Sequence, residues 1–262
     1  MLYNLDIAFP EKSKPEKIAI AKKFYRNLTD TFIEAIKLIS LSEKELHKHA
    51  TFNTDEINDL AAKGKNIQFQ CGHQFNWEFG NYLAAEQLIL PFVGIYMKIN
   101  NKALDRLFIN IRGKKGTVLV AANEFREKMH TVFKNQYSIG LAADQNPSQP
   151  QYGNWLYFFS KPVPFLTGPS KGATRNDSAV VFVQMIKKKR GYYEYKPTII
   201  TENAASLKED ELTILYRDFL EKVIREYPDN YLWTHRRWKW DYSPEFNWID
   251  NRKPPFENKI PA

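Results

Sequence analysis

The sequence predicts an α/β fold: one domain with a central, mostly parallel sheet flanked by helices. The first observation is an alternation of strand-like and helix-like segments in the order strand, helix, which is typical of parallel sheets. The segments are Ile67–Cys71, Asn76–Leu88, Asn101–Ile111, Thr117–Ala121, Glu124–Gln136 and Ser138–Ala143. The second is size, because 262 residues with 43% hydrophobic side chains suffice for one large core. No repeat or linker divides the chain, so residues 1–262 are predicted as one domain, with a helical segment over 1–50 and an α/β core over 51–262.

The elements outside this alternation follow from spacing and from end signals. Residues 15–39 carry apolar side chains at helical intervals after Ser13 and Pro15, which predicts a long amphipathic helix. Capping-box patterns, a serine or asparagine followed three residues later by glutamate, begin helices at Ser42, Asn53 and Ser206. The run "VVFVQMIKKKRGYYEYKPTII" reads as two strands joined by a turn, and it predicts an antiparallel hairpin at a sheet edge.

Composition limits the classes of function. A net charge of +8 favours acidic partners, and aromatic side chains at 15% suit a membrane interface. The longest apolar run, Leu88–Met97, is broken by Pro91 and is shorter than the roughly 18 residues of a spanning helix. One cysteine excludes an internal disulfide and fits a reducing compartment. We expect no structural metal, because the five histidines show no zinc-binding pattern.

The candidate chemistry lies between the strand-like run Ile67–Cys71 and the helix that follows. His73 and Glu78 are five residues apart, and on one helix they would point about 140° away from each other. They can converge if His73 lies in the loop and Glu78 in the first helical turn. Glu78 would then hydrogen-bond one ring nitrogen, and the other nitrogen could take a proton from a hydroxyl. A histidine with only a structural role fits the same spacing.

Cys71 and a cluster of tryptophans near the C-terminus suggest other functions, a nucleophile and a nucleic-acid surface. Cys71 ends an apolar run, where a thiol is more often inert packing than a nucleophile. Trp233, Trp238 and Trp240 alternate with basic residues and could stack on nucleic acid bases, but no nucleic-acid motif accompanies them. We therefore expect no nucleic acid partner.

The block "HQFNWE" (73–78) resembles the H-x-G-N-W-E block of the bacterial lipid A biosynthesis (late, secondary) acyltransferases, which belong to the lysophospholipid acyltransferase superfamily with its H-x4-D/E signature. Four further segments resemble blocks of this family in the same order. They are "IYMKINNKALDRLFINIRGKKG" (95–116), "GLAADQNP" (140–147), "YFFSKPVPFLTGP" (157–169) and "YPDNYLWTHRRWK" (227–239). The resemblance implies a glycerolipid acyltransferase-like fold.

The implied reaction moves a fatty acyl group from a thioester on acyl carrier protein to a hydroxyl of a lipid A precursor. His73 would be the general base and Glu78 its partner. Arg112 would contact an oxyanion or a phosphate, although a solvated surface arginine is the alternative. Asn76, Asp144 and Gln145 complete the expected substrate-binding residues, with Asp144 and Gln145 shaping the turn behind the site, where an ordinary strand-ending turn fits equally well.

The chain also departs from the family pattern. Phe75 replaces a glycine and would narrow the pocket, and Met97 and Lys98 stand where arginine and proline are usual. The family's N-terminal membrane helix has no counterpart, so we expect either a shortened form or a chain held peripherally on the cytoplasmic side of the bacterial inner membrane by residues 15–39 and exposed aromatics.

Several alternatives remain open at the level of sequence. The donor can be acyl carrier protein or acyl coenzyme A, both acidic, and no cofactor is expected beyond this thioester co-substrate. The acceptor can be another lipid, such as an amino lipid or a lysophospholipid. A non-catalytic, basic peripheral membrane protein with the same fold is the alternative from another class.

Overall fold

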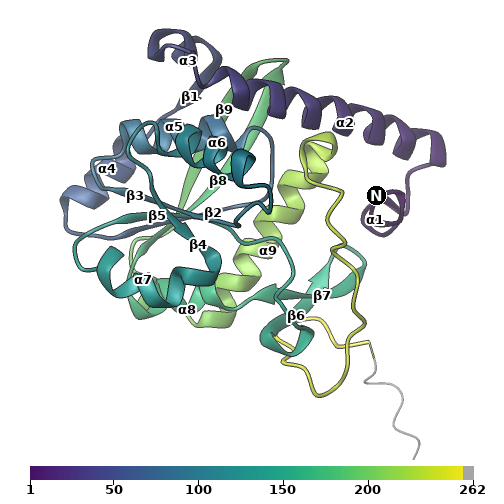
Figure 1. Ribbon diagram of the computed structural model, residues 1–262. Coiled ribbons are helices and arrows are strands. Elements are labelled where there is room, and N and C mark those ends of the chain that lie inside the picture. Colours follow the sequence, from purple (N-terminus) through teal and green to yellow (C-terminus); the bar gives the residue numbers. More distant parts are fainter. Residues whose placement is uncertain (256–262) are drawn as a thin grey trace, which may run out of the picture.

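The computed structural model describes residues 1–255 and is built around a seven-stranded sheet (Figure 1). The strands lie in the order β1-β9-β8-β2-β5-β3-β4, and every neighbouring pair is parallel except β8 and β9. Its strands are β1 (Ala50–Phe52), β2 (Ile67–Cys71), β3 (Phe92–Tyr96), β4 (Val118–Ala121), β5 (Ser138–Ala142), β8 (Ala179–Lys189) and β9 (Tyr192–Thr201). The mostly parallel sheet flanked by helices is thereby confirmed.

Helices cover both faces of this sheet, as parallel strands require because their two faces are both apolar. In Figure 1, α4, α5 and α6 lie above the sheet, and α7, α8 and α9 lie below it. The helices are α1 (Leu2–Ala8), α2 (Lys14–Lys37), α3 (Glu43–His49), α4 (Asp55–Ala62), α5 (Trp77–Gln87), α6 (Lys102–Gly113), α7 (Phe125–Val132), α8 (Gly168–Arg175) and α9 (Glu209–Glu226). Short 3-10 turns lie at η1 (Ala122–Glu124), η2 (Pro150–Tyr152), η3 (Ala204–Ser206) and η4 (Pro228–Asn230).

The long N-terminal helix is confirmed as α2, which begins with Pro15 in its first turn. Its capping box joins Ser13 and Glu16, whose carboxylate accepts a hydrogen bond from the Ser13 amide at 2.8 Å. At α3, Ser42 caps the helix by accepting from the Glu45 amide, as expected. The helices predicted to start at Asn53 and Ser206 start one and two residues later. Thr54 and Lys208 occupy the cap positions of these helices, α4 and α9.

The predicted hairpin forms from β8 and β9, but its place in the sheet was predicted wrongly. The three-residue strand β1 pairs in parallel with β9, so β1 and not the hairpin ends the sheet on this side. A second, two-stranded sheet was not predicted. It consists of β6 (Gly153–Phe158) and β7 (Lys161–Leu166), paired antiparallel.

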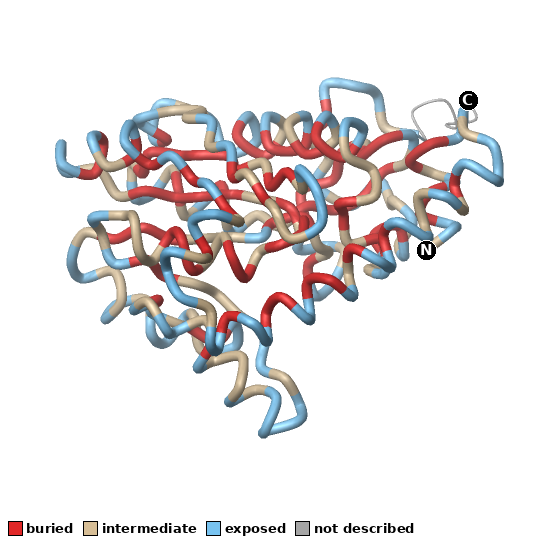
Figure 2. The backbone as a smooth tube through the Cα atoms, turned by 90° about the horizontal axis from the view of Figure 1, so that it is seen from above, coloured by how far each residue is buried: buried red, intermediate tan, exposed pale blue. Residues whose placement is uncertain are grey.

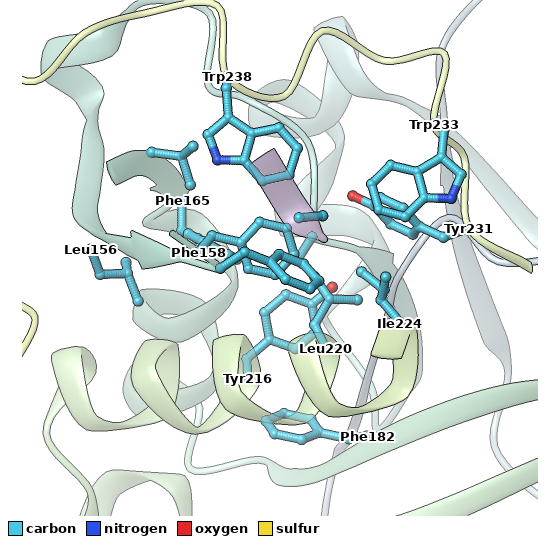
Figure 3. Close-up of a cluster of buried hydrophobic side chains, with 14 of the residues drawn as sticks. Leu156, Phe158, Phe165, Phe182, Tyr216, Leu220, Ile224, Tyr231, Trp233 and Trp238 are labelled. Atoms are coloured by element: carbon cyan, nitrogen blue, oxygen red, sulfur yellow. The ribbon is translucent and has the colours of Figure 1, made fainter. Parts of the chain in front are cut away.

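Strand residues alternate between two apolar cores, and Figure 2 shows the buried backbone concentrated in the middle of the molecule. On β8, Val180 and Phe182 face the core beneath α9, whereas Val181 and Val183 face the core beneath α4 and α5. Figure 3 shows the first core, where aromatic side chains of β6, β7 and α9 meet Tyr231, Trp233 and Trp238 of the C-terminal segment. That segment is therefore part of the α/β domain.

Within residues 1–255, no helix combines the length and the apolarity needed to cross a membrane. Residues 256–262 of the predicted domain lie outside the described part of the chain.

Candidate functional site

Two neighbouring parallel strands bring His73 together with an acidic side chain. In the register of β2 and β5, Cys71 lies opposite Ala142, so His73 and Asp144 each follow their strand end by two residues. The His73 Nδ1 atom lies 2.5 Å from Asp144 Oδ1, and the His73 amide donates to Asp144 Oδ2 at 3.1 Å. The carboxylate thus holds both the ring and the backbone of His73, at the carboxyl ends of strands where α/β proteins bind their ligands.

Burial makes this contact strong. The Asp144 side chain is 1% exposed, and that of His73 is 26% exposed. Burial lowers the pKa of His73, but the charge and the hydrogen bond of Asp144 outweigh it and leave the pKa above its ordinary value. Burial raises the pKa of Asp144, and His73 in turn outweighs it and keeps the pKa of Asp144 low.

The partner of His73 differs from the one predicted. Asp144, not Glu78, accepts the hydrogen bond from the ring of His73. The physical reason is direction: Glu78 lies in the first turn of α5 and points toward α6, while His73 points toward the end of β5. Asp144 was expected as a substrate-binding residue that shapes the turn behind the site.

Glu78 instead forms an ion pair with Arg112 of α6. Arg112 donates from Nε to Glu78 Oε2 at 3.0 Å and from Nη2 to Glu78 Oε1 at 2.6 Å. The indole of Trp77 donates to the same Oε1 at 2.9 Å, and its ring lies edge-on to His73 with centroids 6.3 Å apart. Trp77, which was not predicted as a site residue, therefore connects the two pairs. Its place beside Glu78 in the first turn of α5 was the available signal.

A cavity of about 120 Å³ adjoins the Glu78–Arg112 pair. Its walls come from α2, α5, α6 and the loop after β3, and they are Thr31, Phe32, Ala35, Trp77, Glu78, Ile99, Phe108 and Arg112. Most of these side chains are apolar, so the cavity suits a hydrocarbon group next to a single charged pair. Arg112 lies in the wall of this cavity and is not the solvated surface residue of the alternative interpretation.

The other predicted substrate-binding residues have different surroundings. Asn76 is fully buried and caps α5, because its Oδ1 accepts from the amides of Glu78 and Phe79. Its amide nitrogen donates to Glu34 of α2 at 2.9 Å, which favours a structural role. Gln145 follows Asp144 in a partly buried position after β5. The role of Gln145 toward a substrate stays a prediction.

Phe75 and Cys71 are two further side chains at the connection between β2 and α5. Phe75 is buried between the rings of Phe24 and Trp77, so it fills the space beneath the loop. Burial, aided by the Asp144 charge, raises the pKa of Cys71 to about 12, and a thiol of this kind is a poor nucleophile at neutral pH. Among residues 1–255, no three His, Cys, Asp or Glu side chains are grouped to hold a metal ion.

Sequence comparisons identify the family of this chain. The family model of bacterial lipid A biosynthesis acyltransferases matches residues 1–240. Two similar proteins are the lipid A biosynthesis palmitoleoyltransferase of Escherichia coli (strain K12) and the lipid A biosynthesis acyltransferase of Shigella flexneri. Each is 21% identical over 240 residues, which is 90% of this chain and 76% of the relative. The match over nearly the whole chain shows that it belongs to the bacterial lipid A biosynthesis acyltransferase family and is an enzyme that transfers acyl groups.

Proposed function

We propose that this chain transfers a fatty acyl group from a thioester, carried by acyl carrier protein, to a hydroxyl of a lipid A precursor. The observation that carries the proposal is the His73–Asp144 pair at the carboxyl ends of β2 and β5, in a chain of this family. Asp144 is hydrogen-bonded to Nδ1 of the His73 ring. Within residues 1–255, Nε2 has no hydrogen-bond partner, so it is the nitrogen that would meet a substrate hydroxyl.

The reaction then proceeds as general base catalysis. Nε2 of His73 takes the proton of the acceptor hydroxyl while the oxygen attacks the thioester carbonyl carbon. The carbon–sulfur bond breaks, and the imidazolium returns the proton to the leaving thiolate. Asp144 keeps the proton on Nδ1 before attack and stabilises the positive charge that the ring acquires during it. The site therefore needs no nucleophile of its own.

The cavity beside Trp77 is the proposed place for apolar substrate. It adjoins the His73 ring through Trp77, and its apolar walls would take part of a hydrocarbon chain. Arg112 is the proposed contact for the oxyanion or for a phosphate of the acceptor, because it lies in the same wall. Glu78, whose predicted role at His73 is taken by Asp144, would hold Arg112 in place.

We also propose that α2 rests on the cytoplasmic face of the bacterial inner membrane. Phe32, which lines the cavity, is 52% exposed, and Ile36 on the same helix is 56% exposed. Lys22, Lys23 and Arg26 are exposed on this helix as well, so apolar and basic side chains occur together. This combination is typical of interfacial helices and would let a lipid acceptor enter the cavity from the membrane side.

The decisive experiment assays the purified chain with an acyl-loaded carrier protein and, separately, with acyl coenzyme A. The acceptors are a disaccharide lipid A precursor and a lysophospholipid. We expect acylation of the disaccharide and a loss of at least about 100-fold in kcat for His73→Ala. His130→Ala, at an exposed position of α7, is the matched control and should retain full activity.

Turnover of the lysophospholipid alone would replace the proposed acceptor with another lipid. A His73→Ala variant as active as the native chain would remove the proposed mechanism.

A further inference from the structure

The C-terminal segment Tyr231–Trp238, here called the C-terminal strap, is bonded to the loop that carries His73. Tyr231 forms an isolated antiparallel bridge with Gln74. The Leu232 amide donates to the carbonyl of His73 at 3.0 Å. One contact of the strap therefore falls on the backbone of the proposed base itself.

The same strap is bonded to the turn that carries Asp144. The Asn146 amide donates to Nε2 of His235 at 3.3 Å, and the Asn146 side chain donates to the carbonyl of Arg236 at 2.9 Å. A third hydrogen bond joins Arg237 to the same residue, because its Nη1 donates to Asn146 Oδ1 at 2.5 Å. The strap thus joins the two loops whose relative position sets the distance between His73 and Asp144.

Arg237 is an unusual residue at this place because its side chain is almost fully buried. It is 1% exposed, and its guanidinium lies over the rings of Phe165 and Phe158, with centroids 4.4 Å and 5.7 Å away. Among the described residues, its Nε and Nη2 atoms have no hydrogen-bond partner. A buried cation with unbonded donors is costly, so a compensating interaction is expected.

Neighbouring groups reduce this cost. Nη1 also donates to the carbonyl of Pro164 at 2.9 Å, which anchors Arg237 to β7. Burial lowers the pKa of Arg237 to about 10, and the nearby Tyr231, Asp144 and Tyr216 act against this effect. Arg237 is thus held between the Asn146 turn and β7.

We propose that the C-terminal strap positions the His73–Asp144 pair and that Arg237 is its central positioning residue, tying the Asn146 turn to β7. The inference rests on the proposed role of this pair in acyl transfer. Neither loop is part of the sheet, so strand pairing alone does not fix the two side chains. The bonds of the strap supply this constraint from a distant part of the sequence.

The test measures the titration of the His73 ring by NMR, which does not depend on acyl transfer. The variants are Arg237→Met and Asn146→Ala, with Arg236→Met as the control that removes an exposed neighbouring charge. Besides Asp144, the charged and titratable groups near His73 are Cys71, Tyr216, Tyr231, His235 and Arg237. The two test variants leave the carboxylate and the ring in place, so their effect on His73 reports positioning.

The direction of the shift separates positioning from simple charge. If Arg237 acted only through its charge, its removal would raise the pKa of His73. If it positions Asp144, the looser contact lowers the pKa of His73, and we expect a fall on the order of one unit. Asn146→Ala changes no charge and should lower the pKa in the same direction, together with loss of the hydrogen-bonded Nδ1 proton signal.

Native titration of His73 in a folded Arg237→Met variant and in Asn146→Ala would overturn the inference. A rise in Arg237→Met with no change in Asn146→Ala would do the same. If Arg237→Met does not fold, Asn146→Ala alone decides, because Asn146 lies in a partly buried turn. Absence of acyl transfer in the native chain would contradict the proposed function while leaving this measurement unaffected.

Discussion

At the scale of single residues, the chemistry of the site depends on which nitrogen of His73 carries the proton. Asp144 accepts from Nδ1, so the neutral ring presents the lone pair of Nε2 to an acceptor hydroxyl. The same carboxylate raises the pKa of His73 against the effect of burial. A raised pKa means that the ring is protonated, and therefore inactive as a base, up to a higher pH than an ordinary histidine.

The first prediction concerns this pH dependence. In the native chain, kcat/KM should rise with pH through an apparent pKa above the ordinary value of about 6.5. Asp144→Asn removes the negative charge, so the rise should move to lower pH while kcat falls on the order of 100-fold or more. Asp241→Asn, at an exposed position, is the control and should leave both quantities unchanged. A pH profile of Asp144→Asn identical to the native one would contradict the role of Asp144.

The second prediction concerns the ion pair of Glu78 and Arg112. Glu78→Gln keeps the shape of the side chain but leaves the charge of Arg112 partly buried without a counterion. We expect the free energy of unfolding in urea to fall by about 2–4 kcal/mol. The double variant Glu78→Gln/Arg112→Met removes both charges and should recover part of this loss. Equal losses in the single and the double variant would show that the pair does not act as a unit.

His73 was predictable from the sequence but its partner was not, and the reason is physical. The spacing of His73 and Glu78 is a local property, and it suggested a local contact. The contact with Asp144 depends on β2 lying beside β5 in the register that places Cys71 opposite Ala142. His73 follows one predicted strand by two positions and Asp144 follows another by one, but strand patterns alone do not identify which strands are neighbours.

At the scale of elements, α2 has a buried face and, opposite to it, an exposed apolar face. Its buried face includes Phe24 and Ala35, whereas Tyr25, Phe32, Ile33 and Ile36 are exposed. Large apolar side chains exposed together on one helix indicate an interaction surface. Because Phe32 also lines the cavity, the surface and the proposed site are continuous.

The third prediction tests this face. Ile33→Glu/Ile36→Glu places two charges among the exposed apolar side chains and should reduce binding to phosphatidylglycerol-containing vesicles by at least about tenfold. Leu215→Glu is the matched control, because Leu215 is an exposed apolar residue of α9. Cosedimentation with vesicles measures the binding. Equal binding of the native chain and the double variant would exclude α2 as the membrane contact.

Helices with regular spacing and end signals were predictable, and α2, α5 and α6 begin within one residue of their expected starts. The strand β3 was missed because it lies inside the apolar run Leu88–Met97, whose Pro91 and Gly94 gave no alternation. The strand β7 lies in a segment matched only by the family resemblance, and most of β6 lies just before that segment. Short buried strands carry little periodicity of their own, so their detection needs the pairing partner.

At the scale of the whole molecule, the order of strands in the sheet sets contacts that sequence patterns alone do not predict. The hairpin β8–β9 has a clear local signal, but β1 comes from a distant part of the chain and displaces the hairpin from the edge. The strap similarly reaches the His73 loop from more than 150 positions away, as the hydrogen bond from the Leu232 amide to the carbonyl of His73 shows. Such contacts are set by the assembled fold, which the alternation of elements only constrains to a class.

The last prediction concerns the net charge of +8 and the choice of donor. An acidic carrier protein presents many charges over a large surface, so its encounter with a basic enzyme is steered electrostatically and is screened by salt. Between about 50 mM and 300 mM sodium chloride, the Debye length falls to below 10 Å. We therefore expect kcat/KM for the acyl carrier donor to fall severalfold while kcat stays constant. Acyl coenzyme A, with fewer charges, should show a weaker dependence in the same assay. If the salt dependence is equal for both donors, or absent, the positive charge serves another partner, and the anionic membrane surface beside α2 becomes the first to test.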